Sequence, residues 1–265
     1  MGVYVEVINL AASTDRRDRM RKAFVTAGVT PNFFPAVHFR EVDEQDLFRY
    51  CLPRGPWGRT QPGHMAATIS HMKAWERFLS SNSQYCAIFE DDVYVSTELG
   101  NWFNDLSWWP CAADVVKLEA WRSKSTKVLL EPILENWLGR SVKKLLTRHM
   151  GAAGYMLNRK AAQRLIEARP YNMVIDHVLF NFNASPVSRD LSYYQVVPAL
   201  VTQGNEPPRS TKMDQAEKIS FSEFFVQETK RGILELAYPI SSYWKFASGK
   251  AKLEKVRFKD IAETK

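Results

Sequence analysis

The chain has 265 residues, of which 45% are hydrophobic and 25% are charged, and its formal net charge is +7. This composition is ordinary for a globular protein, and the length suffices to bury the core of one large α/β domain. No run reaches the roughly 18 apolar residues of a membrane-spanning helix, and Glu6 interrupts the first apolar segment, which predicts a strand rather than a signal peptide.

The N-terminal third predicts alternating strands and helices. In chain order we predict a strand over residues 3–10, a helix over 15–27 that ends at Gly28, a strand over 33–37, a helix over 64–80 and a short buried strand over 85–89. A loop rich in proline and glycine, over 51–63, separates the second strand from the second helix. This strand–helix–strand order is typical of an open α/β sheet.

The remaining chain continues the pattern and ends in a basic segment. We predict strands over 114–118, 151–157 and 196–201, a basic amphipathic helix over 134–148, a helix capped by Asn158 that ends near Pro170, and a helix that starts near Asp176. Residues 204–214 predict a loop, and the pattern from Phe221 is helical with a break at Pro239. We therefore divide the chain into a domain over 1–215 and a helical, basic and aromatic extension over 216–265.

The run Glu90-Asp91-Asp92 follows the strand over 85–89 directly. Three adjacent carboxylates repel one another unless a cation or solvent relieves the repulsion. Ligands of open α/β sheets bind beyond the carboxyl ends of the strands, and strand geometry would place Glu90 and Asp92 on one face and Asp91 on the other. Paired oxygens suit a hard divalent ion, so we predict Mg²⁺ or Mn²⁺ at Glu90 and Asp92, against the alternative of an exposed acidic turn.

Several blocks together resemble the family 25 glycosyltransferases, which include lipooligosaccharide β-galactosyltransferases. The resemblance extends from about Val3 to Gln203, and no match is found after Asp214. Its blocks are Val7-Ile8-Asn9-Leu10 with Asp15-Arg16-Arg17; Gly63, Ser70, His71 and Trp75; residues 88–93; Val116-Lys117-Leu118; Gly151, Gly154-Tyr155, Ala161-Ala162 and Leu165; and Asp176-His177.

The resemblance implies a GT-A-type fold, in which an open mixed sheet with helices on both faces binds a nucleotide sugar. It also implies a UDP-sugar donor, most often UDP-galactose, a divalent metal at the acidic run, and inversion at the anomeric carbon. The acceptor it implies is a lipopolysaccharide or lipooligosaccharide core glycan.

Polar residues near the predicted strand ends are candidates for the donor site. Asn9, Arg16 and Arg17 follow the first strand, where they could contact the base or phosphates, since arginine offers phosphate a two-pronged donor; a solvated helical turn is the alternative. Gly63 opens a helix whose free N–H groups could face a diphosphate. We place Ser70 and Asp91 in the same site.

Three residues are candidates for the catalytic step itself. Asp176, at a predicted helix start, is either an N-cap or the general base that takes the proton of the acceptor hydroxyl. Glu119, just beyond a predicted strand, is the second candidate for the base. His71 is either a substrate contact or a packed core histidine, and His177 could orient the acceptor.

The C-terminal segment suggests a further contact. From 241 to 259 it holds six basic residues against one acidic residue, interleaved with Tyr243, Trp244 and Phe246. This mixture predicts contact with an anionic membrane surface, with solvated helices as the alternative, and no motif supports nucleic-acid binding. Cys51, Cys86 and Cys111 predict free thiols in a reducing cytoplasm, on the inner side of the membrane.

Two other classes of function remain open. One is a different metal-dependent nucleotide enzyme, such as a nucleotidyltransferase or phosphotransferase, although no P-loop pattern is present. The other is a non-catalytic module that binds a glycan or a membrane through its basic tail. Loss of function on removal of the acidic run would favour an enzyme over the module.

Overall fold

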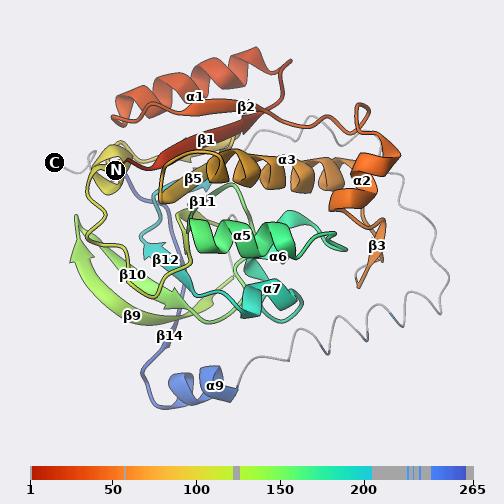
Figure 1. The fold of residues 1–265 in the computed structure, drawn as a ribbon. Helices are drawn as coiled ribbons and strands as arrows, with labels where there is room; N and C mark the ends of the chain where they lie inside the picture. Colours follow the sequence, from red (N-terminus) through yellow and green to blue (C-terminus); the bar gives the residue numbers. More distant parts are fainter. Residues whose placement is uncertain are drawn as a thin grey trace.

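The computed structural model describes residues 2–56, 58–121, 126–204, 226, 229, 233 and 240–260. These residues form a mixed nine-stranded sheet in the order β14-β9-β10-β12-β7-β11-β5-β1-β2, a three-stranded sheet β6-β13-β8 and a two-stranded sheet β3-β4. Figure 1 shows the elements in place. The strands are β1 Tyr4–Asn9, β2 Asn32–Pro35, β3 Arg54–Gly55, β4 Gly58–Arg59, β5 Tyr85–Glu90, β6 Val93–Val95, β7 Val115–Lys117, β8 Glu119–Ala120, β9 Val128–Trp137, β10 Arg140–Leu145, β11 Gly154–Asn158, β12 Tyr193–Val197, β13 Val201–Gln203 and β14 Lys252–Glu254.

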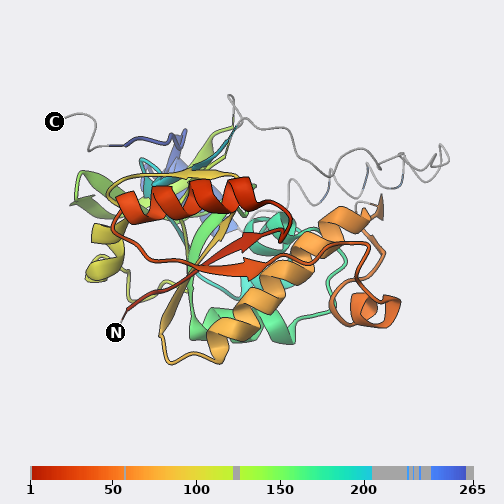
Figure 2. The ribbon, with the colours of Figure 1, turned by 90° about the horizontal axis from the view of Figure 1, so that it is seen from above.

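Helices cover both faces of the large sheet. They are α1 Thr14–Thr26, α2 Glu44–Tyr50, α3 Pro62–Leu79, α4 Leu99–Asn104, α5 Arg159–Glu167, α6 Ile175–Phe180, α7 Pro186–Arg189 and α9 Ile240–Ala247. One core cluster joins α1 and α4 to the sheet, and the second joins α3, α5 and α6 to its other face. Figure 2 shows α1 and α3 on opposite sides of β1 and β2. The predicted α/β class, with a mixed sheet between two helical layers, is confirmed.

The N-terminal elements follow the sequence closely. Strands β1, β2 and β5 are mutually parallel, so their carboxyl ends meet at one edge of the sheet. Helix α1 ends just before Gly28, whose φ of +71° is a left-handed conformation that favours glycine. Asn158 caps α5 as predicted, because its side chain accepts the backbone N–H of Ala161 at 2.8 Å.

The helix predicted over 134–148 is wrong. These residues form the end of β9 and all of β10, which pair antiparallel around a turn. The turn contains Leu138 and Gly139 with φ values of +48° and +77°, which a helix cannot accommodate. Arg140, Val142 and Leu145 point into the core, so the basic side chains between them lie on a strand and not on a helical face.

The late strand predicted over 196–201 is divided into two. Strand β12 ends at Val197, and β13 begins at Val201 and pairs with β6 and β8 instead of the large sheet. Pro198 separates them and has no backbone N–H to continue a ladder. The strand predicted from Gly151 begins only at Gly154.

The described C-terminal residues pack on the sheet. Strand β14 pairs antiparallel with β9, and Phe258 bridges to Ala199. The fully buried Arg140 donates to the carbonyls of Pro198, Ala199 and Lys259, to Ser96 Oγ and to Glu98 Oε2, at 2.7–3.1 Å. The predicted domain boundary at 215/216, most of the loop over 204–214 and nearly all of the helical pattern before Ile240 lie outside the described residues.

None of the helices in the described ranges is long and apolar enough to cross a membrane. The three cysteines are free thiols as predicted, with Cys51 and Cys86 buried and Cys111 exposed.

Candidate active site

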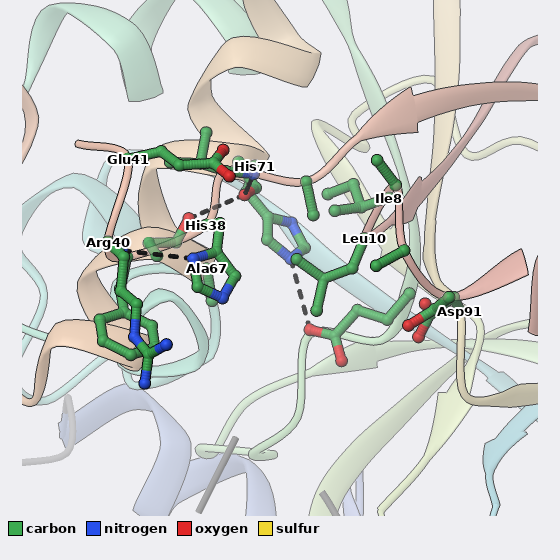
Figure 3. A pocket seen from close by; sticks show the side chains of 18 residues that line it. Ile8, Leu10, His38, Arg40, Glu41, Ala67, His71 and Asp91 are labelled. Carbon is green, nitrogen blue, oxygen red and sulfur yellow. Dashed lines mark hydrogen bonds and ion pairs between the residues drawn. The ribbon is translucent and has the colours of Figure 1, made fainter. Parts of the chain in front are cut away.

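A cleft of about 680 Å³ opens at the edge where the carboxyl ends of β1, β2 and β5 meet. Its walls are residues 10–13 after β1, residues 36–41 after β2, the first half of α3, and the acidic pair at the end of β5. Figure 3 shows His71, Asp91 and the loop with His38, Arg40 and Glu41 around this space. The cleft therefore lies where open α/β sheets bind their ligands.

Five of the predicted site residues line this cleft: Gly63, Ser70, His71, Glu90 and Asp91. Gly63 lies in the first turn of α3, and a Cβ added there would meet no atom within 4 Å. Ser70 joins two walls of the cleft, because its hydroxyl donates to the carbonyl of Ala66 at 2.7 Å and accepts the backbone N–H of Val37 at 2.9 Å. It therefore holds α3 against the loop over 36–41.

Asn9, Arg16 and Arg17 are not among the residues that line the cleft, and they form a network around Asp91 instead. The Asp91 carboxylate accepts from Asn9 Nδ2 at 2.7 Å and from the Arg16 guanidinium at 2.9 Å. Arg17 Nε donates in turn to Asn9 Oδ1 at 3.0 Å. Arg19 donates to the Asp91 carbonyl at 2.8 Å, so the turn after β5 is fixed to α1 by backbone and side chain alike.

Glu90 points toward α3, away from the Asp91 network. Its Oε1 lies 3.4 Å from His71 Nε2, a contact that Figure 3 marks with a dashed line, and its Oε2 lies 3.5 Å from Gln203 Nε2. Strand β5 ends at Glu90, and Asp91 and Asp92 form the turn to β6, so strand alternation does not extend to Asp92. The Asp92 carbonyl accepts the backbone N–H of Gly204 at 2.7 Å.

Glu90 and Asp92 offer carboxylate oxygens, which are the ligands that hard divalent ions prefer, but only Glu90 of the two lines the cleft. No group of three or more His, Cys, Asp or Glu side chains in the described ranges is arranged to hold a metal by itself. Mg²⁺ and Mn²⁺ sites of nucleotide enzymes need only one or two carboxylates, because substrate phosphates supply further ligands. Since both Glu90 oxygens make only long hydrogen bonds, they keep acceptor capacity for such an ion.

A buried charged cluster lies next to the cleft. Lys117 Nζ donates to the carbonyls of Met150, at 2.8 Å, and Gly151, and it lies 3.4 Å from Glu119 Oε2 and 4.1 Å from the centre of the Phe180 ring. Burial lowers the pKa of Lys117. The negative charges of Glu119, Asp176 and Glu90 offset only part of this lowering. Carboxylates on three separate elements thus influence one buried ammonium group, and Glu119 is the one in contact with it.

Glu119 and His149 are both perturbed by burial. Burial raises the pKa of Glu119 to about 7, against the opposing effect of Lys117. Burial and the nearby Lys117 charge lower the pKa of His149 to about 3, so this histidine is neutral. The Glu119 carboxylate is fully buried and accepts the backbone N–H of Ala153 at 3.0 Å, so it faces the protein interior.

Asp176 lies half-buried in the first turn of α6. The N-cap of this helix is Val174, so the alternative that Asp176 is the N-cap is wrong. Neither Asp176 nor Glu119 lines the cleft over 10–13 and 36–41. His177 is engaged with Asn181, whose Nδ2 lies 2.8 Å from His177 Nδ1.

Several residues of this site are not predicted from the sequence. The loop over 36–41 forms a wall of the cleft, and Gln203 reaches Glu90 from β13. Lys117 and Tyr155 were recognised only as parts of matching blocks. Both are polar residues inside buried strands. A polar group at such a position needs a hydrogen-bond partner in the core, and this requirement could have identified them as candidates.

Comparison with known proteins gives consistent matches. The sequence model of glycosyltransferase family 25, described as LPS biosynthesis protein, matches residues 3–179. The lipooligosaccharide biosynthesis protein lic2B of Haemophilus influenzae is 26% identical over 221 residues, which cover 78% of this chain and 79% of that protein. The lacto-N-neotetraose biosynthesis glycosyltransferase LgtE of Neisseria gonorrhoeae is 27% identical over 208 residues, with 74% and 72% covered. Among solved structures, a glycosyltransferase involved in the glycosylation of the major capsid of PBCV-1 aligns with a TM-score of 0.36 and 12% identity, over 78% of this chain and 96% of that one.

Proposed function

The chain belongs to glycosyltransferase family 25, and on this premise we propose that it transfers galactose from UDP-galactose onto a lipopolysaccharide or lipooligosaccharide core glycan, with inversion at the anomeric carbon. That it is a glycosyltransferase follows from the family, which implies a nucleotide-sugar donor and a glycan acceptor. The observation that supports this proposed transfer reaction is the cleft at the carboxyl ends of β1, β2 and β5, with Glu90 and Asp91 in its wall.

We propose that the fold is of the GT-A type. Support comes from the strand order β2-β1-β5-β11-β7-β12, in which the antiparallel β11 lies between two parallel groups. The acidic run follows β5, the strand beside the switch to antiparallel pairing. A donor placed there would have its diphosphate near the acidic run and the start of α3.

Glu90 and Asp92 would hold the divalent ion, Mn²⁺ or Mg²⁺. When bound, the ion neutralises the charge of the diphosphate leaving group. The protein's own side chains fix the geometry of the site. The Asn9–Arg16–Arg17 network fixes the turn that carries Asp91 and Asp92, and Ser70 fixes the opposite wall of the cleft. Such positioning accounts for much of the catalysis expected for glycosyl transfer.

Asp176 is the base that we propose for the acceptor hydroxyl. The hydroxyl oxygen forms the new bond to the anomeric carbon, its proton passes to the Asp176 carboxylate, and the bond from that carbon to the diphosphate breaks with its electron pair on the leaving group. Glu119 is the less suitable base, because its carboxylate is fully buried and is already engaged with Ala153 N–H and Lys117.

The direct test is sugar transfer measured with purified protein. UDP-galactose, UDP-glucose and GDP-, CMP- and dTDP-sugars are each supplied with a core oligosaccharide, with Mn²⁺ or EDTA, and products are identified by mass spectrometry and anomeric NMR coupling. We expect a β-galactoside only with UDP-galactose and Mn²⁺, and loss of about 10²-fold or more in rate for Asp92→Asn and Asp176→Asn. The exposed Asp105→Asn is the matched control. An α-linked product would overturn the assignment as an inverting enzyme. Full activity in EDTA would overturn the metal dependence.

We also propose that α9 and the basic residues after it contact the cytoplasmic membrane surface. Ile240, Tyr243 and Trp244 lie on one outward helical face and are 86%, 52% and 69% exposed, whereas Ser242 is buried. Lys250 and Lys252 follow and are exposed. Aromatic and basic side chains together suit an anionic lipid surface.

Vesicle sedimentation tests this contact separately from the chemistry. We expect binding to phosphatidylglycerol vesicles, little binding to phosphatidylcholine vesicles, and loss of binding in Ile240→Ser/Trp244→Ser. The control is Val25→Ser, which removes a similarly exposed apolar side chain, 64% exposed, on α1. Equal sedimentation of both variants would reject the membrane contact.

A further inference from the structure

We infer that His71 is a positioning residue for Glu90, and that Trp75 and Tyr155 hold it in the tautomer that carries its proton on Nε2. The inference rests on the proposed function, because it concerns how the carboxylate of the acidic run is aimed into the donor cleft. His71 and Trp75 lie one helical turn apart on α3, and Tyr155 lies on β11, the neighbour of β5.

The chain of contacts begins at the indole of Trp75. Trp75 Nε1 lies 2.9 Å from the Tyr155 hydroxyl, and His71 Nδ1 lies 2.9 Å from the same oxygen. All three side chains are at most 1% exposed. The His71 and Tyr155 rings are also stacked, with an interplanar angle of 16° and centroids 5.8 Å apart.

The protons on Trp75 and Tyr155 determine the direction of each hydrogen bond at the Tyr155 hydroxyl. An indole N–H can only donate, so the Tyr155 oxygen accepts from Trp75. Burial raises the pKa of Tyr155 well above its ordinary value, so the phenol keeps its one hydrogen. Within the described part of the chain, His71 Nδ1 is the remaining hydrogen-bond partner of this hydroxyl.

His71 Nδ1 must therefore accept, and the ring proton lies on Nε2. If Nδ1 carried a proton, both Trp75 and His71 would donate to the Tyr155 oxygen, and the buried phenolic hydrogen would have no acceptor. An unsatisfied buried group of this kind costs about 1–3 kcal/mol. The opposite tautomer is disfavoured for this reason.

The Nε2 proton of His71 affects the orientation of Glu90 in the cleft. His71 Nε2–H faces Glu90 Oε1 at 3.4 Å, and Gln203 Nε2 approaches the other carboxylate oxygen at 3.5 Å. One donor on each oxygen restricts rotation of the carboxylate, while the Glu90 side chain keeps 30% exposure toward the cleft. Donors behind a functional carboxylate set its orientation, and their loss typically costs 10–100-fold in activity or metal affinity.

The tautomer can be measured directly by long-range ¹H–¹⁵N NMR on the full-length protein, since the chain has only five histidines. The His71 signals are assigned from their absence in His71→Gln. We expect the Nε2–H pattern in the wild type and a mixture of tautomers in Tyr155→Phe. The matched control is Tyr193→Phe, which removes a fully buried hydroxyl that has no hydrogen-bond partner in the described ranges. An Nδ1–H pattern in the wild type, or equal spectra of the two Tyr variants, would overturn the inference.

Activity then separates positioning from packing. The amide nitrogen of glutamine can reach the place of His71 Nε2, whereas that of asparagine reaches only the place of Nδ1. We expect kcat/KM to fall 10–100-fold in His71→Asn and to be largely retained in His71→Gln, with both variants folded by circular dichroism. Equal losses in the two variants contradict positioning through Nε2. A wild type that transfers no sugar would instead contradict the proposed function, and the NMR experiment would still decide the tautomer.

Discussion

The Arg16 guanidinium and the Asp91 carboxylate, 75 positions apart in the chain, form an ion pair of 2.9 Å in which the side chains are only 12% and 13% exposed. The pair joins helix α1 to the turn that carries the acidic run. Because the two charges are largely shielded from water, the pair differs from the exposed ion pairs on the surface of the protein.

Asp91→Asn should therefore destabilise the protein and weaken donor binding together. The substitution keeps the shape of the side chain but leaves the Arg16 charge without its carboxylate, which we expect to lower the free energy of unfolding by about 1–3 kcal/mol. Urea denaturation measures this change, and calorimetry with UDP measures binding. The control is Asp18→Asn, whose 74% exposed side chain pairs with Arg21 at 3.3 Å and should contribute less than about 0.5 kcal/mol. Similar changes in the two variants would contradict a special role for the Arg16–Asp91 pair.

Lys117→Met should be among the most destabilising substitutions in the chain. It leaves Glu119 buried without its cation, which typically costs about 3–5 kcal/mol. We expect Lys117→Met/Glu119→Gln to be more stable than Lys117→Met alone, because no uncompensated carboxylate remains. Urea denaturation of the two single variants and the double variant gives the coupling free energy. Strict additivity would show that the two side chains act independently.

The free energy of unfolding should depend on pH through Glu119. Its pKa is about 7 in the folded protein and 4.5 for the ordinary carboxyl, so the folded state binds more protons between these values. Its contribution to stability therefore declines as pH rises from 4.5 through 7, by up to roughly 3 kcal/mol. Glu119→Gln lacks this decline, and the difference in unfolding free energy between the variant and the wild type should grow in favour of the variant over that range. A constant difference would place the Glu119 pKa near its ordinary value.

Gly151→Ala should disturb the buried cluster. Gly151 has a φ of +89°, and a Cβ there would come within 2.5 Å of Glu119 Oε1 and 2.8 Å of Trp121 Cε3. We expect a loss of about 2–4 kcal/mol, the sum of backbone strain and overpacking. Gly249→Ala isolates the strain, because φ there is +72° and no atom lies within 4 Å of the added Cβ. Thermal unfolding compares the two, and equal losses would show that the clash is relieved.

The location of the cleft could be predicted because it follows from local rules. Apolar runs with clear ends predicted β1 and β5, and parallel strands place their carboxyl ends together, so Glu90 and Asp91 could be assigned to one edge of the sheet. The roles of Asp176 and Glu119 remain predictions. Their relation to the cleft depends on how α6 and β8 pack, which periodicity along the chain does not encode.

The hairpin formed by β9 and β10 shows where the local rules fail. Trp137, Leu138, Val142 and Leu145 recur at spacings that suit a helix, yet Val142 and Leu145 are buried in a strand and Leu138 lies in the turn. Gly139 was the signal for the turn, since a glycine between two short apolar segments favours a reversal. The loop over 36–41 could not be predicted either, because an irregular backbone has no periodic pattern.

The buried Arg140 has a consequence for how the protein is made. Its hydrogen bonds join residues 96–98, 198–199 and Lys259, and β14 completes the edge of the sheet only at Lys252–Glu254. During translation Arg140 is synthesised more than a hundred residues before the last of these acceptors. The nascent chain therefore lacks one acceptor of Arg140 and the edge strand β14 until residue 259 leaves the ribosome, and a chain stalled earlier presents chaperones and proteases with that open sheet edge.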